Sequence, residues 1–388
     1  MKILVLAPHP FYQARGTPIA VDILLRCLSE RGDEVDLVTF HEGSDRFYER
    51  VQIHRIKPII GIHGIRPGLS MKKIYCDLHL FFRFISLIRK KDFDLIHAVE
   101  EGAFMAWIVC AWKKKPFIYD MDSSMSTQVV NKFKFLRPFM NVMQWLESQP
   151  IRRAAAVVPV CTELARNALR CGAKQVVVLP DISLMQADEL EVKEDSLHQI
   201  RKTSQKIAMY IGNLEPYQGI DLMLESFALV RMKTDTLVLV VIGGAERDIG
   251  KYRARAEQLG IQEAVHFLGP RPIENLGQYI MQANILVSPR TEGVNTPMKL
   301  YSYLDSGIPV LATDLPTHTQ VVNSKMAMLA APEKEAFAQA MLRLIEDEPL
   351  GSQLAWEAKE FVAKKYSYDS FKNTLHGLYA RLETQICN

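Results

Sequence analysis

The chain has 388 residues, of which 48% are hydrophobic and 23% are charged, and its formal net charge is +3. This composition excludes a disordered chain and suffices for two domains of ordinary size, each with its own apolar core. Basic residues predominate in residues 1–180 and acidic residues in residues 181–388, and we expect no nucleic-acid partner.

Strand-like apolar runs alternate with amphipathic helical segments along both halves of the chain. Continuous apolar strands separated by such helices indicate parallel sheets covered on both faces, so each half is predicted to be a doubly wound, Rossmann-like α/β domain. In chain order the runs are residues 2–7, 35–40, 94–98, 116–120, 155–160 and 176–180, then 206–212, 236–244, 264–269, 285–289 and 309–313.

The boundaries follow from the gap between these two sets of runs. Residues 183–205 are polar and charge-rich without a strand-like run and are interpreted as a linker. We therefore predict one domain over residues 1–182, a second over 206–365, and a closing helix over 366–388.

The cysteines and the apolar segments indicate in which cellular compartment the protein is expected. The six cysteines form neither a CxxC pair nor a disulfide framework, so we expect reduced thiols in a cytoplasmic protein and no metal site. The opening run "KILVLA" is too short for a signal peptide, and no uncharged run is long enough to span a bilayer. We expect neither a leader nor a membrane-spanning segment.

Three loops at the carboxyl ends of predicted strands are unusual, and ligands of such domains bind at that edge. In "HPFYQARGTPIAV", Gly16 would allow close backbone approach and Thr17 precedes a proline that can begin a helix, although an ordinary turn would read the same way. The second loop is "YIGNLEPYQGID", with two glycines before a helix. The third, "VSPRTEGVNTPMKLYSYLDSGIPVLAT", holds one carboxylate, Glu292, before a helix expected to open near Pro297.

Together these segments resemble the family 4 glycosyltransferases, which have two facing Rossmann-like domains, the B-type glycosyltransferase fold. "YIGNLEPYQGID" is similar to the family's GRLxxxKGID, residues 240–269 to its Gly-rich strand, helix and VxFxG, and "SPRTEG…YLDSGIPVLAT" to PSxxEGFG…EAMAxGxPVVA. The resemblance covers nearly the whole chain. It implies an acceptor domain first, a nucleotide-sugar domain second, and a last helix that crosses back onto the first domain.

The sequence departs from the family at the donor diphosphate. The family's basic pair in GRL…KG is replaced by Asn213 and Gln218. Of the family's Glu-x7-Glu pair, Glu292 matches the carboxylate on the donor sugar, but the second position falls on Leu300 or Ser302. The remaining residues that we assign to the nucleotide-sugar site are Gly16, Gly212, Gly243, Arg271, Asn295, Thr296 and Pro297.

Lys299 could replace the missing positive charge. It is expected in the first turn of a helix, where the dipole disfavours a cation unless an anion lies between them. A solvated surface lysine is the alternative, and Arg290 or Arg15 are weaker candidates for the same role. Ser302 could bond a ribose hydroxyl, and Asp305 on the same helix face could supply the lost carboxylate.

For the first domain the resemblance implies a strand-end histidine that contacts the donor sugar. His97 matches it, and a structural histidine is the alternative. The residues expected to contact the acceptor are Arg15, Thr17, Asp120 and Asp122. The resemblance also implies transfer with retained anomeric configuration, without a metal or cofactor, in which the leaving diphosphate helps to take the acceptor proton.

Two segments, residues 70–94 and 131–146, combine basic ends with aromatic residues. They favour a lipid or glycan acceptor at the anionic inner face of the cell membrane, although helices packed on a sheet can show the same pattern. The donor is expected to be UDP-linked. A nucleotide-sugar 2-epimerase of the same fold, or a binding protein with a degraded phosphate site, are the alternative functions.

Overall fold

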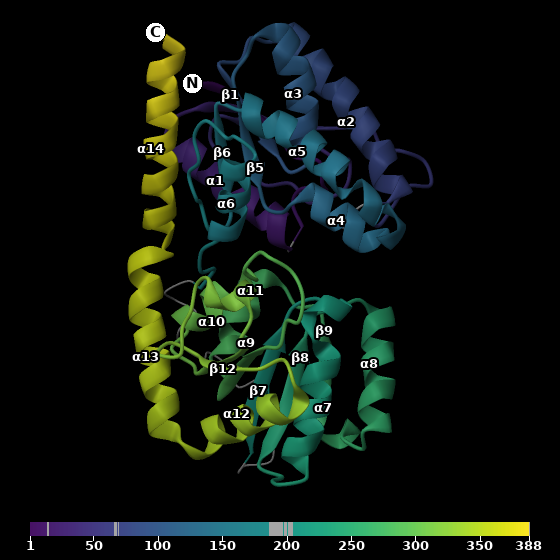
Figure 1. Ribbon diagram of the computed structural model, residues 1–388, viewed down its shortest axis with the longest axis vertical. Helices are drawn as coiled ribbons and strands as arrows, with labels where there is room; N and C mark the ends of the chain where they lie inside the picture. The colour runs from purple at the N-terminus through teal and green to yellow at the C-terminus, as the bar shows by residue number, and fades with distance from the viewer. Residues whose placement is uncertain are drawn as a thin grey trace. The chain divides into compact units, whose positions relative to one another are not determined.

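The computed structural model describes residues 1–13, 15–65, 68, 70–185, 197, 200 and 205–387. The chain divides into two compact units, of which unit 1 comprises Met1–Pro180 with Phe371–Asn388 and unit 2 comprises Asp181–Ser370. Each unit contains a six-stranded parallel sheet flanked by helices (Figure 1). The doubly wound architecture predicted for both halves is confirmed. Most of the proposed linker, residues 183–205, lies outside the described residues.

Unit 1 has the strand order β3-β2-β1-β4-β5-β6. Its strands are β1 (Lys2–Leu6), β2 (Glu34–Thr39), β3 (Val51–Arg55), β4 (Leu95–Val99), β5 (Phe117–Met121) and β6 (Ala156–Pro159). Its helices are α1 (Gly16–Glu30), α2 (Met71–Lys90), α3 (Gly102–Lys113), α4 (Met125–Lys132), the 3-10 helix η1 (Lys134–Phe139), α5 (Met140–Arg153), α6 (Thr162–Arg170) and α14 (Tyr368–Cys387).

Unit 2 repeats this topology with the order β12-β11-β10-β7-β8-β9. Its strands are β7 (Lys206–Ile211), β8 (Leu237–Ile242), β9 (Val265–Gly269), β10 (Ile285–Ser288), β11 (Val310–Thr313) and β12 (Met328–Ala330). Its helices are α7 (Ile220–Arg231), α8 (Glu246–Gln258), α9 (Leu276–Ile280), α10 (Lys299–Asp305), α11 (Pro316–Thr319), α12 (Lys334–Glu346) and α13 (Glu348–Lys365), with 3-10 turns η3 (Pro216–Gln218), η4 (Gln262–Ala264) and η5 (Ile273–Asn275).

The strand order reverses at one point in each sheet. In unit 1 the chain starts at β1 and runs outward to β3 before returning to β4, and in unit 2 the same reversal lies between β7 and β10. Doubly wound domains bind ligands outside the carboxyl ends of the strands at such a reversal point. The loops after β1, β4, β7 and β10 are therefore the places where a site is expected.

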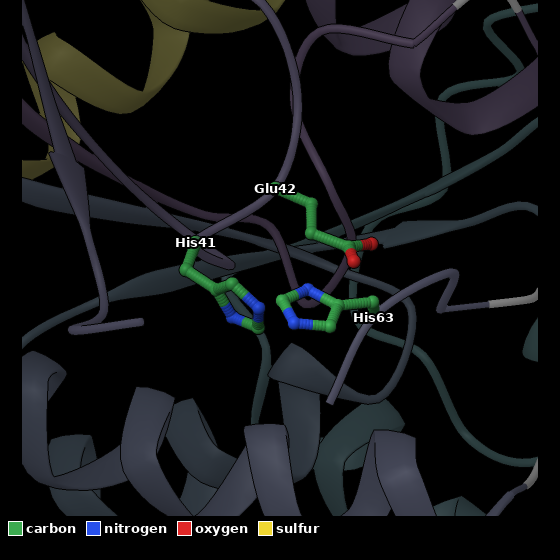
Figure 2. A group of neighbouring side chains, drawn as sticks. All are labelled: His41, Glu42 and His63. Carbon is green, nitrogen blue, oxygen red and sulfur yellow. The ribbon is translucent and has the colours of Figure 1, made fainter. Parts of the chain in front are cut away.

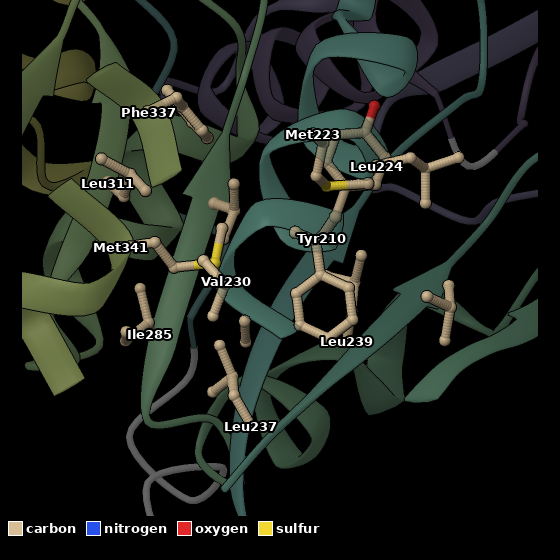
Figure 3. Packing of buried hydrophobic residues seen from close by; sticks show 14 of the residues in the cluster. Tyr210, Met223, Leu224, Val230, Leu237, Leu239, Ile285, Leu311, Phe337 and Met341 are labelled. Atoms are coloured by element: carbon tan, nitrogen blue, oxygen red, sulfur yellow. The ribbon is translucent and has the colours of Figure 1, made fainter. Parts of the chain in front are cut away.

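The apolar runs correctly predicted the strands that are buried on both faces. All six residues of β8 are buried, and α7 and α12 cover the same core, in which Tyr210, Leu239, Phe337 and Met341 meet (Figure 3). The strand expected at residues 176–180 is wrong, because only an isolated bridge joins Val176 to Val157. The edge strands β3 and β12 were missed, since one is half-polar and the other has three residues.

The last helix, α14, packs on unit 1 as the resemblance implied. Its buried face includes Leu375, Leu378 and Leu382, and its exposed flank reaches α1, where Lys372 Nζ lies 2.5 Å from Glu30. Of the helices in the described residues, none is both long enough and apolar enough to cross a bilayer.

Candidate active site

Two loops meet at the reversal point of unit 2, because a glycine lets them approach. Gly219 has φ +75°, and a Cβ there would lie 1.9 Å from the carbonyl oxygen of Pro289. The loop after β10 is fixed to the turn before α7 by the Thr291 N–H, which donates to the Tyr217 carbonyl at 3.0 Å. The backbone geometry thus brings the start of α7 against the loop that leads to α10.

Lys299 lies where these loops meet. Its Nζ is 3.6 Å from the ring centroid of Tyr210, on β7, and 3.5 Å from Oε1 of Gln218. A Cβ on Gly212, which has φ +152°, would be only 3.2 Å from the same nitrogen. Gln218 stands where the family carries a basic residue, so the ammonium group of Lys299 lies beside the position from which a charge has been lost.

A second cation, Arg290, lies near enough to Lys299 for the two positive charges to repel each other. Burial lowers the pKa of Lys299 well below its usual value, and the charge of Arg290 lowers it further. Burial also lowers the pKa of Arg290, whose side chain is 7% exposed and donates to the Glu292 carbonyl at 2.7 Å and to Asn295 Oδ1 at 2.9 Å. Among the described residues, neither cation forms an ion pair with a carboxylate. Two like-charged groups that are largely withdrawn from water and lack a counter-ion favour the binding of an anion.

Two N–H groups in the first turn of α10 are already used in hydrogen bonds within the chain. α10 has seven residues and begins at Lys299, two residues after Pro297. The N–H groups of Leu300 and Tyr301 already donate to the carbonyls of Pro297 and Met298, at 2.9 and 3.2 Å. The N–H groups of Leu300 and Tyr301 are therefore not free for a diphosphate, whereas binding by the backbone of the preceding "NTPM" segment stays a prediction.

His318 is a buried neighbour that the sequence analysis missed. Its pKa is lowered to about 3, chiefly by burial and also by the charges of Lys299 and Arg290, although a hydrogen bond to the Thr313 carbonyl opposes the shift. Its Nε2 lies 2.8 Å from Ser288 Oγ and its Nδ1 lies 3.0 Å from the Thr313 carbonyl oxygen. A neutral imidazole thus joins β10 to β11 without adding a third positive charge. Only its place after the strand at residues 309–313 could have indicated it.

The other residues assigned to the nucleotide-sugar site are distributed unevenly. Thr296 is buried, and its Oγ1 has no partner in the described residues. Glu292 is exposed on the same loop, so its carboxylate is open to a ligand. Ser302 Oγ already accepts the Leu184 N–H at 3.0 Å. Arg271 is exposed and follows β9, the edge strand two places from β7.

Two further glycines differ in what they do. Gly243 has φ +106°, and a Cβ there would lie 2.2 Å from the Gly212 carbonyl oxygen, so the backbones after β7 and β8 touch. Gly16 begins α1 without a left-handed backbone, and a Cβ added there would meet no atom within 4 Å. No described part of the chain thus packs closely against Gly16, and its contact with a ligand stays a prediction.

His97 requires a correction. It is 0% exposed, its Nδ1 lies 2.8 Å from the Tyr379 hydroxyl on α14, and its Nε2 lies 3.2 Å from Asp120 Oδ2 on β5. Both ring nitrogens are used inside unit 1, so the expectation that His97 contacts the donor sugar is wrong. It joins β4, β5 and α14, and the Asp120 side chain, expected at the acceptor, is one of its partners.

Glu100 is a carboxylic acid at the reversal point of unit 1. It follows β4 with φ +49°, which is rare for a residue other than glycine. Burial raises its pKa to about 7 despite hydrogen bonds from Ser123 Oγ at 3.0 and 2.8 Å, and Lys73 opposes the rise. At the end of β1, His9 is buried and its Nε2 has no partner among the described residues.

The remaining acceptor candidates lie around this edge without forming one cluster. Arg15 precedes α1 and its Nη1 donates to the Ile65 carbonyl at 3.3 Å, while burial lowers its pKa. Thr17 is half-buried in the first turn of α1, and Asp122 is half-buried after β5.

The comparisons with known proteins agree with this architecture. Residues 14–181 match the model "Glycosyltransferase Family 4", and residues 192–361 match "Glycosyl transferases group 1". The chain belongs to the family 4 glycosyltransferases. This glycosyltransferase is 23% identical to the alpha-monoglucosyldiacylglycerol synthase of Streptococcus pneumoniae, over 98% of this chain and 85% of that protein. It is also 23% identical to a D-inositol 3-phosphate glycosyltransferase of Corynebacterium aurimucosum, over 98% of this chain and 96% of that one.

Solved structures show the same fold. Sucrose-phosphate synthase from Thermosynechococcus elongatus superposes with a TM-score of 0.80 at 18% identity, covering 99% of both chains. The Anabaena protein HepE in complex with UDP gives a TM-score of 0.76 at 15% identity, over 98% of this glycosyltransferase and all of HepE. The two-domain B-type glycosyltransferase fold is thus shared with these proteins.

Proposed function

We propose that this glycosyltransferase moves a sugar, with retained anomeric configuration, from a UDP-linked donor to a lipid or glycan acceptor at an anionic membrane surface on the cytoplasmic side. The observation that carries the proposal is a pair of cations, the half-buried Lys299 and the buried Arg290, that lack a carboxylate partner among the described residues at the reversal point of unit 2. A diphosphate would supply about two negative charges there.

The diphosphate is assigned to Lys299 first. In this proposal its ammonium group does what the family's basic pair does from the turn before α7, because it lies 3.5 Å from the Gln218 side chain that replaces one of that pair. Stacking over the Tyr210 ring holds the cation in place before the anion arrives. Arg290 is fixed by two hydrogen bonds and strengthens the positive potential.

The donor sugar is assigned to the loop between Arg290 and α10. Glu292 would accept hydrogen bonds from sugar hydroxyls, and the unpartnered Thr296 hydroxyl is a second group that could bond the donor. The choice of UDP is supported by the structural neighbour HepE, whose structures contain UDP and UDP-glucose. With the diphosphate held by cations, negative charge that develops on the leaving group is stabilised without a metal or cofactor, and that oxygen can take the acceptor proton.

The membrane assignment rests on exposed aromatic and basic side chains of unit 1. Along η1 and the first turns of α5 the exposed apolar residues include Phe135, Phe139, Val142, Trp145 and Leu146. The exposed Lys134 and Arg137 belong to the same segment. The outer face of α2 exposes Met71, Ile74, Tyr75, Leu78 and Phe82. Large apolar side chains that face water beside cations suit the interface of an anionic bilayer. A similar protein, the S. pneumoniae synthase, is named for a glycolipid product.

The test measures product formation and donor binding separately. The purified chain is incubated with UDP-, GDP- and ADP-sugars, with and without vesicles that contain diacylglycerol, monoglucosyldiacylglycerol or phosphatidylinositol acceptors, and nucleotide release is followed. We expect UDP release that requires an acceptor and a glycosylated product with retained configuration. Sugar conversion without any acceptor would instead indicate the epimerase, and failure to bind any nucleoside diphosphate would refute the donor site.

A further inference from the structure

A histidine–glutamate–histidine cluster lies beyond the carboxyl end of β2, in unit 1. One ligating atom each from His41, Glu42 and His63 lies within 4.8 Å of the other two. Figure 2 shows the two imidazole rings side by side with ring nitrogens turned toward one another, and the Glu42 carboxylate beside His63. Two imidazole nitrogens and one carboxylate oxygen are a ligand set that Zn²⁺ takes in proteins, with a remaining position for water.

Backbone groups of one short loop hold these side chains. The Glu42 carboxylate accepts the Gly64 N–H at 2.7 Å on Oε1 and the Ile65 N–H at 3.1 Å on Oε2. Nε2 of His41 lies 3.0 Å from the Ile62 carbonyl oxygen. Metal-binding side chains are commonly oriented by such outer hydrogen bonds. The loop that supplies them also carries His63, so all three ligands are fixed by the same four residues.

The His41 ring has an unsatisfied nitrogen. Its Nδ1 is buried and has no hydrogen-bond partner in the part of the chain that the structure describes. If Nε2 donates to the Ile62 carbonyl, the neutral ring leaves a lone pair on Nδ1. A buried nitrogen without a hydrogen-bond partner is unfavourable. Hydrogen bonds within the loop therefore do not explain why the His41 ring is buried there.

We propose that the chain binds one Zn²⁺ ion, or a similar divalent transition-metal ion, through His41, Glu42 and His63. The ion fastens the loop after β3 to the end of β2. Because Arg15 donates to the carbonyl of Ile65, the same loop also contacts the residue that precedes α1. Metal occupancy therefore controls the order of the loop at this edge of unit 1, independently of the diphosphate site in unit 2.

Zinc affinity of the chelator-treated chain tests the proposal, measured by competition with a chromophoric chelator. The parent should bind one Zn²⁺ per chain, and His63→Ala and Glu42→Gln should each weaken binding at least tenfold. His79→Ala is the matched control, because His79 is a half-buried histidine on α2 that contacts Tyr75. Zn²⁺ should raise the melting temperature of the parent and of His79→Ala, but not that of His63→Ala.

Two results would overturn the proposal. One is equal zinc affinity for the parent and His63→Ala, a variant whose truncated side chain is exposed and leaves the core of unit 1 intact. The other is a thiolate-to-metal charge-transfer band with Co²⁺, which would assign the metal to cysteines such as the half-buried Cys171. UDP binding serves as the folding control, since it depends on unit 2 and should be the same in all variants.

Discussion

Replacing Lys299 by methionine tests the diphosphate site most directly. Methionine keeps a similar length and can remain packed over the Tyr210 ring, which lies 3.6 Å from the lysine nitrogen, but it removes the charge. A charge-assisted hydrogen bond contributes about 1.5–3 kcal/mol, and each 1.4 kcal/mol is about tenfold in affinity. Lys299→Met should therefore weaken UDP binding by roughly 10- to 150-fold, as measured by isothermal titration calorimetry.

The same substitution should not destabilise the fold. The folded-state pKa of Lys299 is lowered from 10.5, so the unfolded chain holds this proton more tightly than the folded one. The resulting cost is fully present below the folded-state pKa and disappears as pH rises toward 10.5. At pH 7 Lys299→Met should unfold at an equal or higher urea concentration than the parent. UDP binding to the parent should take up protons between the folded-state pKa of Lys299 and 10.5, because the diphosphate raises that pKa.

Lys251→Met is the matched control for this experiment. Lys251 also lies over a tyrosine, with Nζ 4.4 Å from the ring centroid of Tyr252, but it is exposed and lies 4.0 Å from Asp221. Its pKa is raised, chiefly by the Tyr252 hydroxyl. We expect unchanged UDP affinity for this variant. Equal affinity of Lys299→Met and the parent would refute the assignment and leave Arg290 as the cation to test.

Four further predictions concern other parts of the chain. Glu292→Gln should lower turnover at least tenfold while UDP binds as before, because its carboxylate is proposed to meet only the sugar; weakened UDP binding would contradict this. The pKa of Glu100 is raised from 4.5 to about 7, so its contribution to stability falls as pH rises through that range. Glu100→Gln should therefore reduce the difference between the urea midpoints of unfolding at pH 5 and pH 8. An unchanged difference would contradict this prediction. His97→Ala should lower the free energy of unfolding by about 1–3 kcal/mol, since the half-buried Asp120 carboxylate and the buried Tyr379 hydroxyl lose their partner, while UDP affinity stays the same. A large loss of turnover in a fully stable variant would restore a catalytic role. Trp145→Ser should reduce binding to anionic vesicles, whereas Trp356→Ser, a change at a similarly exposed tryptophan of unit 2 (63% against 59%), should not; equal effects in a flotation assay would remove the membrane surface from η1 and α5.

The fold was accessible from the sequence because central parallel strands are buried on both faces. Such strands read as short, continuous apolar runs, as in "LVLVVI" of β8. An edge strand has one solvated side and fewer partners, so β3, with the sequence "VQIHR", carries no comparable pattern. The apolar run at residues 176–180 lies beside β6, but one bridge and the hydrogen bond from the Leu179 N–H to the Pro159 carbonyl do not complete a strand there.

The sequence also determined which chemical groups lie at the strand ends, since a loop follows its strand wherever the chain goes. Lys299 could be placed near a helix start, and the loss of positive charge at Gln218 could be read from the resemblance. That these two side chains, 81 residues apart, come within 3.5 Å depends on the order in which the strands pair.

Tertiary structure alone decided which groups are used internally and which remain for a ligand. His97 and Lys299 both looked like strand-end or loop residues with a role in the site. His97 meets the Tyr379 hydroxyl from a helix 282 residues later, whereas Lys299 meets a neutral amide and an aromatic face. Local sequence fixes backbone conformation and burial pattern over a few residues, but a side chain's remaining hydrogen-bonding and charge capacity is set by neighbours that only the packing of distant segments brings to it.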